Sequence, residues 1–311
     1  MPATDAMLVL DEVEVRSTTR LSPTYVRLEL GGPCLADFGV DGPTYDQRVK
    51  LVVPGPTGRL PLIDGAAGSW YADWLALPSE ERGHMRTYTV REVRGTGAGT
   101  RLVVDVAVHG TPPTGPGAAW AAAAAPGDRC VLVGPRRGVP FGGIEFAPGD
   151  AESLLLVADE TGVPAVAAIL EQLAEEDPDA RGTAFLEVPL HDDVQQLRAP
   201  VGVDVRWLVR DGREWGAEAV PAVRRHVGLA GWPGDPAPSG GADDVWETPS
   251  YSAAGEALPD RLPAHLRCYA WIAGESGVVR TLRRALVGEL GWERAQVAFM
   301  GYWREGVSMR S

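Results

Sequence analysis

The hydrophobic pattern of the sequence changes near its midpoint, and this change limits the folds that the chain can adopt. Before about residue 150, apolar and polar residues alternate in short runs separated by Gly and Pro. After it, Leu154–Ala158 is continuously apolar and precedes a helical pattern in which Val166, Ile169 and Leu173 share one face. Alternation is typical of strands with one buried face, and a continuous apolar run of a parallel strand covered on both faces. The 311 residues suffice for two domains, and we expect two of different class.

The first half predicts an antiparallel β-barrel. Strands are expected at five short runs bounded by Gly and Pro clusters: Tyr25–Leu30, Gln47–Val53, Arg86–Val93, Arg101–Val108 and Arg129–Val133. One Ala-rich helix is expected near Ala118–Ala125. Several short strands joined by turns are typical of a closed barrel.

The second half predicts an open parallel α/β domain, because strand and helix patterns alternate along it. Further strands are expected at Thr183–Val188, Val203–Val209, Cys268–Ala273 and Gln296–Gly301. Helices are expected at Glu214–Val227 and Gly277–Leu290. The boundary is expected within Ala147–Asp150, which gives domains at 1–148 and 149–311. A stretch rich in Pro, Gly, Asp and Ser, at about 231–257, is expected to be a flexible surface insertion.

Charge and cysteine content exclude several classes of function. A net charge of -13 argues against nucleic-acid binding, and no apolar run reaches the ~18 residues of a membrane span. The cysteines, Cys34, Cys130 and Cys268, are odd in number and far apart, which excludes a disulfide framework and the usual metal-ligand spacings. We expect a cytoplasmic monomer without membrane insertion and without a metal site of its own.

The hexapeptide Arg86–Arg91 is the first candidate site. On a strand, Arg86 and Tyr88 point to one face, and Thr87 and Thr89 point to the other. Arginine can hold a pyrophosphate through two hydrogen bonds, and tyrosine offers a ring face to a flat ligand. The alternative for this hexapeptide alone is an ordinary edge strand with an arginine–carboxylate pair.

The hexapeptide resembles the Arg-x-Tyr-Thr-x-Arg motif of the siderophore-interacting protein family, FAD-containing ferric-siderophore reductases of the ferredoxin-reductase-like superfamily. Four further blocks keep the family's order: His109-Gly110 with Gly115–Ala121, Gly134–Gly138, Asp159–Ala165, and Trp271–Glu275 with Gly301–Arg304. The resemblance implies an N-terminal FAD-binding barrel and a C-terminal NAD(P)H-binding α/β domain. It also implies that electrons pass from NAD(P)H through FAD to the Fe(III) of a siderophore, which releases Fe(II).

The resemblance and the residue chemistry together give the candidate site residues, with no catalytic side chain beyond the flavin. Those for FAD are Arg86, Thr87, Tyr88, Thr89, Val108, His109, Gly115, Pro116, Gly117, Ala118 and Trp120. Those for NAD(P)H are Asp159, Glu160, Thr161, Arg210, Gly274 and Glu275. Those for the ferric siderophore are Lys50, which is the only lysine of the chain, Arg136, Arg137, Trp303 and Arg304.

The chain departs from the family pattern at one place that matters for FAD. Ala118 and Ala119 stand where members typically carry Ser and Arg, so a phosphate would depend on Arg86 and on backbone N–H groups at the helix N-terminus. Arg210 and Arg213 could read the adenosine phosphate of NADPH, or they could be solvated loop arginines. Three alternatives stay open: a general NAD(P)H flavin reductase, a siderophore-binding escort protein with weak flavin use, and a reductase that takes electrons from a ferredoxin.

Overall fold

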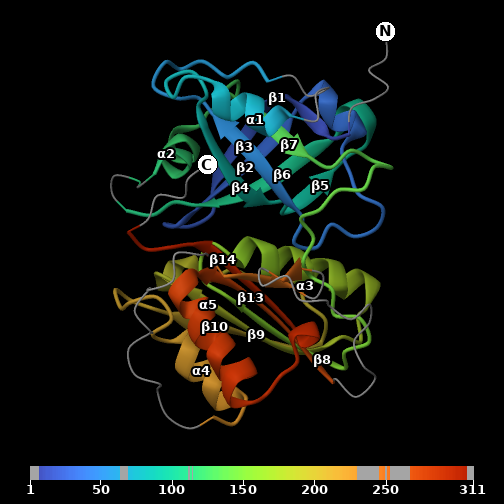
Figure 1. Ribbon diagram of the computed structural model, residues 1–311, viewed down its shortest axis with the longest axis vertical. Helices are drawn as coiled ribbons and strands as arrows, with labels where there is room; N and C mark the ends of the chain where they lie inside the picture. The colour runs from blue at the N-terminus through green and yellow to red at the C-terminus, as the bar shows by residue number, and fades with distance from the viewer. Residues whose placement is uncertain are drawn as a thin grey trace. The chain divides into compact units, whose positions relative to one another are not determined.

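The chain divides into two compact units, residues 1–144 and 145–310, in the computed structural model (Figure 1). The structure describes residues 7–63, 69–110, 113, 115–229, 245–248, 251–252 and 267–306. Each unit is built around its own seven-stranded sheet.

The first unit is an antiparallel sheet that curls into a barrel. Its strands are β1 (Val9–Arg20), β2 (Tyr25–Gly31), β3 (Arg48–Val53), β4 (His84–Thr89), β5 (Glu92–Arg94), β6 (Arg101–Ala107) and β7 (Arg129–Gly134), in the order β4-β3-β7-β1-β2-β6-β5. The two outermost strands, β4 and β5, are joined by only two residues. The Val90 N–H donates to Gln47 O at 2.8 Å and the Arg91 N–H to Val103 O at 2.9 Å, so this short link bonds to both ends of the sheet.

Strand β3 is covered on both faces, which decides where the site residues of β3 and β4 can point. Val49 and Leu51 belong to the main barrel core, which the helix α2 (Pro116–Ala123) also enters through Ala121. Val52 belongs to a second, smaller core beneath the helix α1 (Trp70–Ala76), together with the fully buried Trp74. Side chains that alternate along these strands therefore face either α2 or α1.

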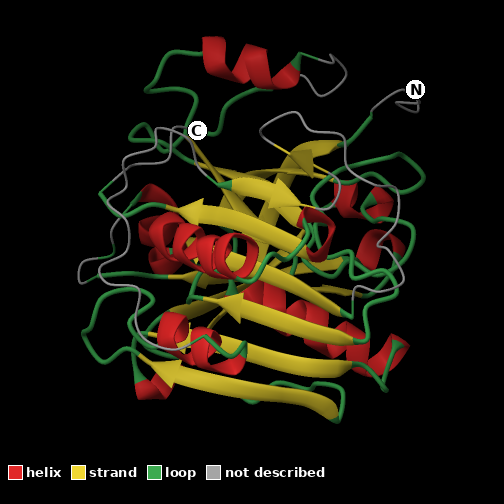
Figure 2. Ribbon diagram, turned by 60° about the horizontal axis from the view of Figure 1, so that its bottom comes forward, coloured by secondary structure: helices red, strands yellow, loops and turns green. Residues whose placement is uncertain are grey.

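The second unit is a mostly parallel sheet with helices on both sides (Figure 2). Its strands are β8 (Ser153–Ala158), β9 (Arg181–Val188), β10 (Gly202–Val209), β11 (Trp246–Thr248), β12 (Tyr251–Ser252), β13 (Cys268–Glu275) and β14 (Val297–Trp303), in the order β10-β9-β8-β13-β14-β11-β12. The first five in this order are parallel, and β11 and β12 are antiparallel additions at one edge. The helices are α3 (Val163–Glu176), α4 (Ala219–His226) and α5 (Ser276–Arg283), and α5 continues into a π-helical turn at Arg284–Glu289.

The predicted fold class is confirmed, and four predicted elements need correction. The strand expected at Arg86–Val93 is two strands, because Val90 and Arg91 bond to different neighbours. The helix expected at Glu214–Val227 begins only at Ala219, since the Glu187 carboxylate accepts hydrogen bonds from the backbone there. The helix expected at Gly277–Leu290 changes to π geometry at Arg284.

The expected surface insertion is also corrected in part, because β11 and β12 form a hairpin that extends the sheet. Apart from Val245, the rest of the stretch at 231–257 lies outside the described residues. Strand β1 and helix α1 were not predicted. Within the described ranges, no helix combines the length and the apolar character needed to cross a bilayer.

Candidate functional site

The N-terminus of α2 packs directly on the Arg86 and Tyr88 side chains, so two motifs far apart in the sequence form one surface. A Cβ on Gly117 would lie 2.4 Å from the Tyr88 hydroxyl and 3.0 Å from Arg86 Cγ. Only glycine fits this contact. The chain enters the helix through Gly115, at φ +85, and through Pro116 in the first turn, where a missing N–H costs nothing.

This helix end is suited to an anion. The first N–H groups of a helix have no partner within the helix, and the N-cap residue Gly115 has no side chain that could accept from them. The N–H groups of Gly117 and Ala118 therefore present the positive end of the helix dipole beside Arg86. One nitrogen of the half-buried Arg86 guanidinium donates to Met85 O at 2.7 Å, which fixes the side chain against β4.

The other residues predicted for FAD lie in different surroundings. Tyr88 and Trp120 pack against the barrel core, and burial raises the pKa of Tyr88 to about 12, so its hydroxyl stays protonated. Thr87 and Thr89 lie on the face of β4 opposite Tyr88, where Thr87 is exposed and Thr89, at the end of the strand, is buried. Val108 is buried beyond β6. A helix N-terminus packed on a glycine, an aromatic ring and a nearby guanidinium are groups that could hold FAD.

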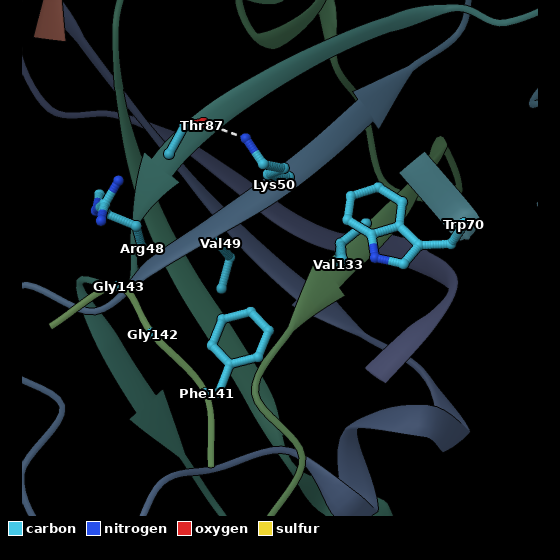
Figure 3. Close-up of a pocket in the computed structure, with 9 residues that line it drawn as sticks. All are labelled: Arg48, Val49, Lys50, Trp70, Thr87, Val133, Phe141, Gly142 and Gly143. Atoms are coloured by element: carbon cyan, nitrogen blue, oxygen red, sulfur yellow. Dashed lines mark hydrogen bonds between the residues drawn. The ribbon is translucent and has the colours of Figure 1, made fainter. Parts of the chain in front are cut away.

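A pocket of about 300 Å³ lies on the opposite face of the same strand pair (Figure 3). It is lined by Arg48, Val49, Lys50, Trp70, Thr87, Val133, Phe141, Gly142 and Gly143. Lys50 Nζ donates to Thr87 Oγ1 at 3.2 Å, because the two residues are partners in the β3–β4 register. Burial and the nearby Arg48 lower the pKa of Lys50. Sequence reasoning found Lys50 but missed Arg48 and the two aromatic rings.

The other two candidates for siderophore binding in the first unit do not line this pocket. Arg136 forms an ion pair with Asp37 at 3.0 Å, and Arg137 donates to Phe38 O at 3.2 Å. Both arginines hold the segment after β7 against the turn that contains Phe38. Lys50 is therefore the one of the three that the structure brings to a cavity.

In the second unit, Asp159 connects several residues predicted for NAD(P)H at the carboxyl ends of β8 and β13. One carboxylate oxygen accepts from Thr161 N and Thr161 Oγ1 at 2.8 and 2.6 Å. The other accepts from Glu275 N and Trp303 Nε1 at 2.7 and 2.8 Å. A Cβ on Gly274 would lie 2.6 Å from this carboxylate. Burial, with a smaller effect of the Glu160 charge, raises the pKa of Asp159 to about 7.

Arg210 is placed differently from the prediction. Its guanidinium forms two hydrogen bonds with Glu160, at 2.7 and 2.9 Å, and lies 5.2 Å from the ring centre of Trp215. Glu160 is fully buried and needs a counter-ion, so Arg210 cannot turn to a nucleotide phosphate without leaving that charge unpaired. Arg213 is held as well, by Glu218 and by the Arg210 carbonyl.

The remaining candidates in this unit are also held by internal contacts. The Glu275 side chain accepts from the N–H groups of Gly277 and Val278 and so caps α5. Trp303 packs edge-on against Trp215, with 4.8 Å between ring centroids, and the half-buried Arg304 follows it. Sequence reasoning missed Trp215 and Glu187. A glutamate within the apolar strand Thr183–Val188 was the available signal for Glu187.

Two further observations describe the chemistry that is available. Nowhere in the described ranges do three or more His, Cys, Asp or Glu side chains gather as metal ligands would. Burial raises the pKa of Cys34, Cys130 and Cys268 to about 11 or 12, with Asp11 adding to the effect at Cys34, so these thiols stay protonated.

Comparisons with known proteins agree with the motifs. Residues 151–306 match the model described as siderophore-interacting protein, and residues 14–139 match the siderophore-interacting FAD-binding domain. An uncharacterized protein of Mycobacterium tuberculosis is 35% identical over 96% of this chain and 91% of its own length. The NADPH-dependent ferric-chelate reductase of Escherichia coli is 26% identical over 94% of this chain and 92% of its own. The crystal structure of a siderophore utilization protein from T. fusca has a TM-score of 0.67 at 30% identity, covering 98% of this chain and 96% of that one.

Proposed function

The chain belongs to the siderophore-interacting protein family, and from this premise we propose that it is an FAD-dependent reductase of ferric siderophores. Electrons pass from NAD(P)H through the flavin to Fe(III), and Fe(II) leaves. Hard oxygen ligands hold Fe(III) better than Fe(II), so reduction loosens the complex. The observation that supports this most is the position of the α2 N-terminus against Arg86 and Tyr88, with the Lys50 pocket on the opposite face of the same strands.

FAD would be held by the first unit. Arg86 and the N–H groups of Gly117 and Ala118 would bind the pyrophosphate, and the Tyr88 ring would lie along the isoalloxazine. The backbone at Thr89, next to Tyr88, would contact the ring edge. Bound FAD accepts two electrons together and releases them singly, which matches a two-electron donor to a one-electron acceptor.

The ferric siderophore would bind at Lys50. The chain carries a net charge of -13, so an anionic complex needs a local cation, and Lys50 supplies one in a pocket whose described lining residues include no acidic side chain. Arg136 is a weaker candidate than Lys50, because Asp37 already neutralises it. Trp303 and Arg304, which belong to the second unit, are also proposed to contact the siderophore.

The nucleotide would bind at the carboxyl ends of β8 and β13, where ligands bind in open α/β sheets. Asp159, Thr161, Gly274 and Glu275 lie together there. Glu160 acts indirectly, as the counter-ion of Arg210. Arg210 is not part of this proposed site, because its guanidinium neutralises the buried charge of Glu160.

Replacing Lys50 tests the substrate assignment. Lys50→Ala should raise the KM for an anionic ferric siderophore about tenfold, as expected for a lost charge-assisted contact, and should leave the flavin content unchanged. Arg129→Ala is the matched control, because Arg129 is a barrel cation paired with Glu12 outside the pocket. An unchanged KM in Lys50→Ala would remove Lys50 from the site.

The colour of the purified protein separates the main alternatives. The reductase proposal expects yellow protein with flavin absorbance. Colourless protein whose fluorescence is still quenched by a ferric siderophore would favour the escort alternative. Rapid turnover of simple acceptors, unaffected by Lys50→Ala, would favour a general flavin reductase. If a ferredoxin reduces the flavin and neither NADH nor NADPH does, the electron donor is a ferredoxin and not a nucleotide.

A further inference from the structure

One arginine of the second unit has no partner among the described residues. The Nη1 and Nη2 atoms of Arg280, on α5, are buried from water and form no hydrogen bond there. This is unfavourable, because a buried guanidinium without an acceptor loses its hydration and gains nothing in return. The residue as a whole is only half-buried, which leaves part of its side chain open to an approaching ligand.

Other arginines of this unit that are at least half-buried do have carboxylate partners. The pairs are Arg210 with Glu160, Arg224 with Glu289, and both Arg283 and Arg294 with Glu247. A buried arginine in this unit is therefore usually balanced by an acidic side chain. Arg280 departs from this rule, and a group that needs an anion in the free protein is a candidate for binding one from outside.

The carboxylates that α5 meets are already in use. Glu247, on β11, accepts from Arg283 at 2.8 Å and forms an ion pair with Arg294 at 2.9 Å. Glu275 caps α5 by accepting from the N–H groups of the next turn. The described part of the chain thus offers Arg280 no free carboxylate, although the chain as a whole carries a net charge of -13.

The position of Arg280 on α5 directs it toward the carboxyl end of the sheet. Helix α5 packs along β13 and β14 (Figure 1). Ser276 lies four residues earlier on the same face, and its hydroxyl donates to Trp303 O at 2.9 Å, so this face meets the end of β14. Side chains on a helix lean toward its N-terminus, and Arg280 is only about 7.5 Å along α5 from the N-cap. An extended arginine spans about this length.

This edge of the sheet is where a nucleotide would bind, and a nucleotide brings phosphates. A guanidinium matches phosphate oxygens through two parallel hydrogen bonds. The extra phosphate of NADPH belongs at the end of β10, which β9 and β8 separate from β13. We propose that Arg280 binds the pyrophosphate, which NADH and NADPH share. The proposal rests on the proposed function, because it adds a binding residue for the donor of that reaction.

Binding of ADP-ribose, which carries the pyrophosphate without the nicotinamide, tests this without turnover. The readout is the Kd from titration calorimetry on the oxidised holoprotein. Arg280→Met should weaken ADP-ribose binding about tenfold or more, as the loss of a charged hydrogen bond would. Arg280→Lys should retain part of the affinity, because it keeps the charge and loses the planar fork. Binding of 2′-phospho-ADP-ribose should weaken by the same factor.

Unfolding in urea separates a ligand-binding role from a structural one. Because Arg280 has no partner in the free protein, Arg280→Met should leave the urea midpoint unchanged or raise it. Arg224→Met is the matched control, since Arg224 is also a buried arginine but both of its terminal nitrogens bind Glu289, at 2.7 and 3.0 Å. Arg224→Met should lower the midpoint and leave the affinity for ADP-ribose unchanged.

Several results would overturn the proposal. They are no binding of ADP-ribose to wild type, unchanged affinity in Arg280→Met, a loss confined to 2′-phospho-ADP-ribose, and a urea midpoint that falls as far as in Arg224→Met. Inorganic pyrophosphate that binds as tightly as ADP-ribose would also overturn it, because the site would then take any such anion. If ADP-ribose binding depends on Arg280 but flavin reduced by NADH yields no Fe(II), the proposed function fails and the assignment of Arg280 stands.

Discussion

At the scale of residues, each unit contains positions where a larger residue would collide with its neighbours. Gly117 lies where any Cβ would meet the Tyr88 hydroxyl, and Gly274 lies where any Cβ would meet Asp159. Asp159 itself accepts four hydrogen bonds from three residues. Each of these residues joins segments far apart in the sequence, so single substitutions there should alter a whole site.

Replacing Gly117 tests the proposed FAD cradle. In Gly117→Ala the added methyl group must displace Tyr88, and overpacking of this kind costs about 1–3 kcal/mol. We expect FAD affinity to fall about tenfold or more, measured as the flavin retained after gel filtration and as the Kd for added FAD. Ala122→Ser, on the exposed side of the same helix, should leave both values unchanged. Full flavin content in Gly117→Ala would contradict the placement of the cradle.

Asp159 should make stability depend on pH in a defined direction. Burial raises its pKa from 3.8 to about 7, so between these values the folded chain holds a proton that the unfolded chain releases. The contribution of Asp159 to stability therefore falls as the pH rises toward about 7 and is constant above it. The stability advantage of wild type over Asp159→Asn, measured by urea unfolding, should shrink between about pH 5 and about pH 7.5. If the stability of wild type relative to Asp159→Asn instead grows over this interval, folding lowers the pKa of Asp159 and does not raise it.

At the scale of elements, we expect the end of β10 to determine which nucleotide the second unit accepts. Arg210 and Arg213 are both held by glutamates, and the exposed Asp211 and Glu214 add negative charge beside them. NADPH differs from NADH by one more phosphate on the adenosine ribose, and a cation at this position is what accommodates it. The described residues here offer acidic groups instead, so we expect NADH to be the better donor, unlike in the E. coli relative.

Freeing Arg213 tests this expectation. Glu218→Gln removes the carboxylate that holds Arg213, and it should raise kcat/KM for NADPH about threefold while leaving the value for NADH unchanged. Glu152→Gln is the matched control, because Glu152 also pairs with an arginine but precedes the amino end of β8. If the wild-type protein prefers NADPH, the inference that Arg210 does not bind the adenosine phosphate is wrong.

Sequence patterns predicted elements whose signal is local and failed where the deciding contact is distant. The apolar run Leu154–Ala158 predicted β8 because burial on both faces shows in composition. The break between β4 and β5 depends on bonds to Gln47 and Val103, which no local pattern reveals. The pairing of Arg210 with Glu160 was not predicted for the same reason, since Glu160 lies fifty positions away in the sequence. Trp70 and Phe141 meet at one pocket only after folding.

At the scale of the whole molecule, an acidic chain is proposed to handle three anionic ligands. With a net charge of -13, it requires local cations for each ligand. In the first unit they are Arg86 with the α2 N-terminus, and Lys50 with Arg48. In the second unit Arg210 and Arg213 are held by internal partners, which is why its nucleotide should be the less charged one.

The central claim is electron transfer from a nicotinamide nucleotide through FAD to siderophore-bound iron. The most direct measurement is anaerobic mixing of the yellow protein with NADH, followed by a ferric catecholate complex, with flavin absorbance recorded and Fe(II) trapped by a chromogenic chelator. We expect the flavin bands to bleach with NADH and to return as the colour of the Fe(II)–chelator complex develops. Bleached flavin that yields no Fe(II) with either catecholate or hydroxamate complexes would contradict it.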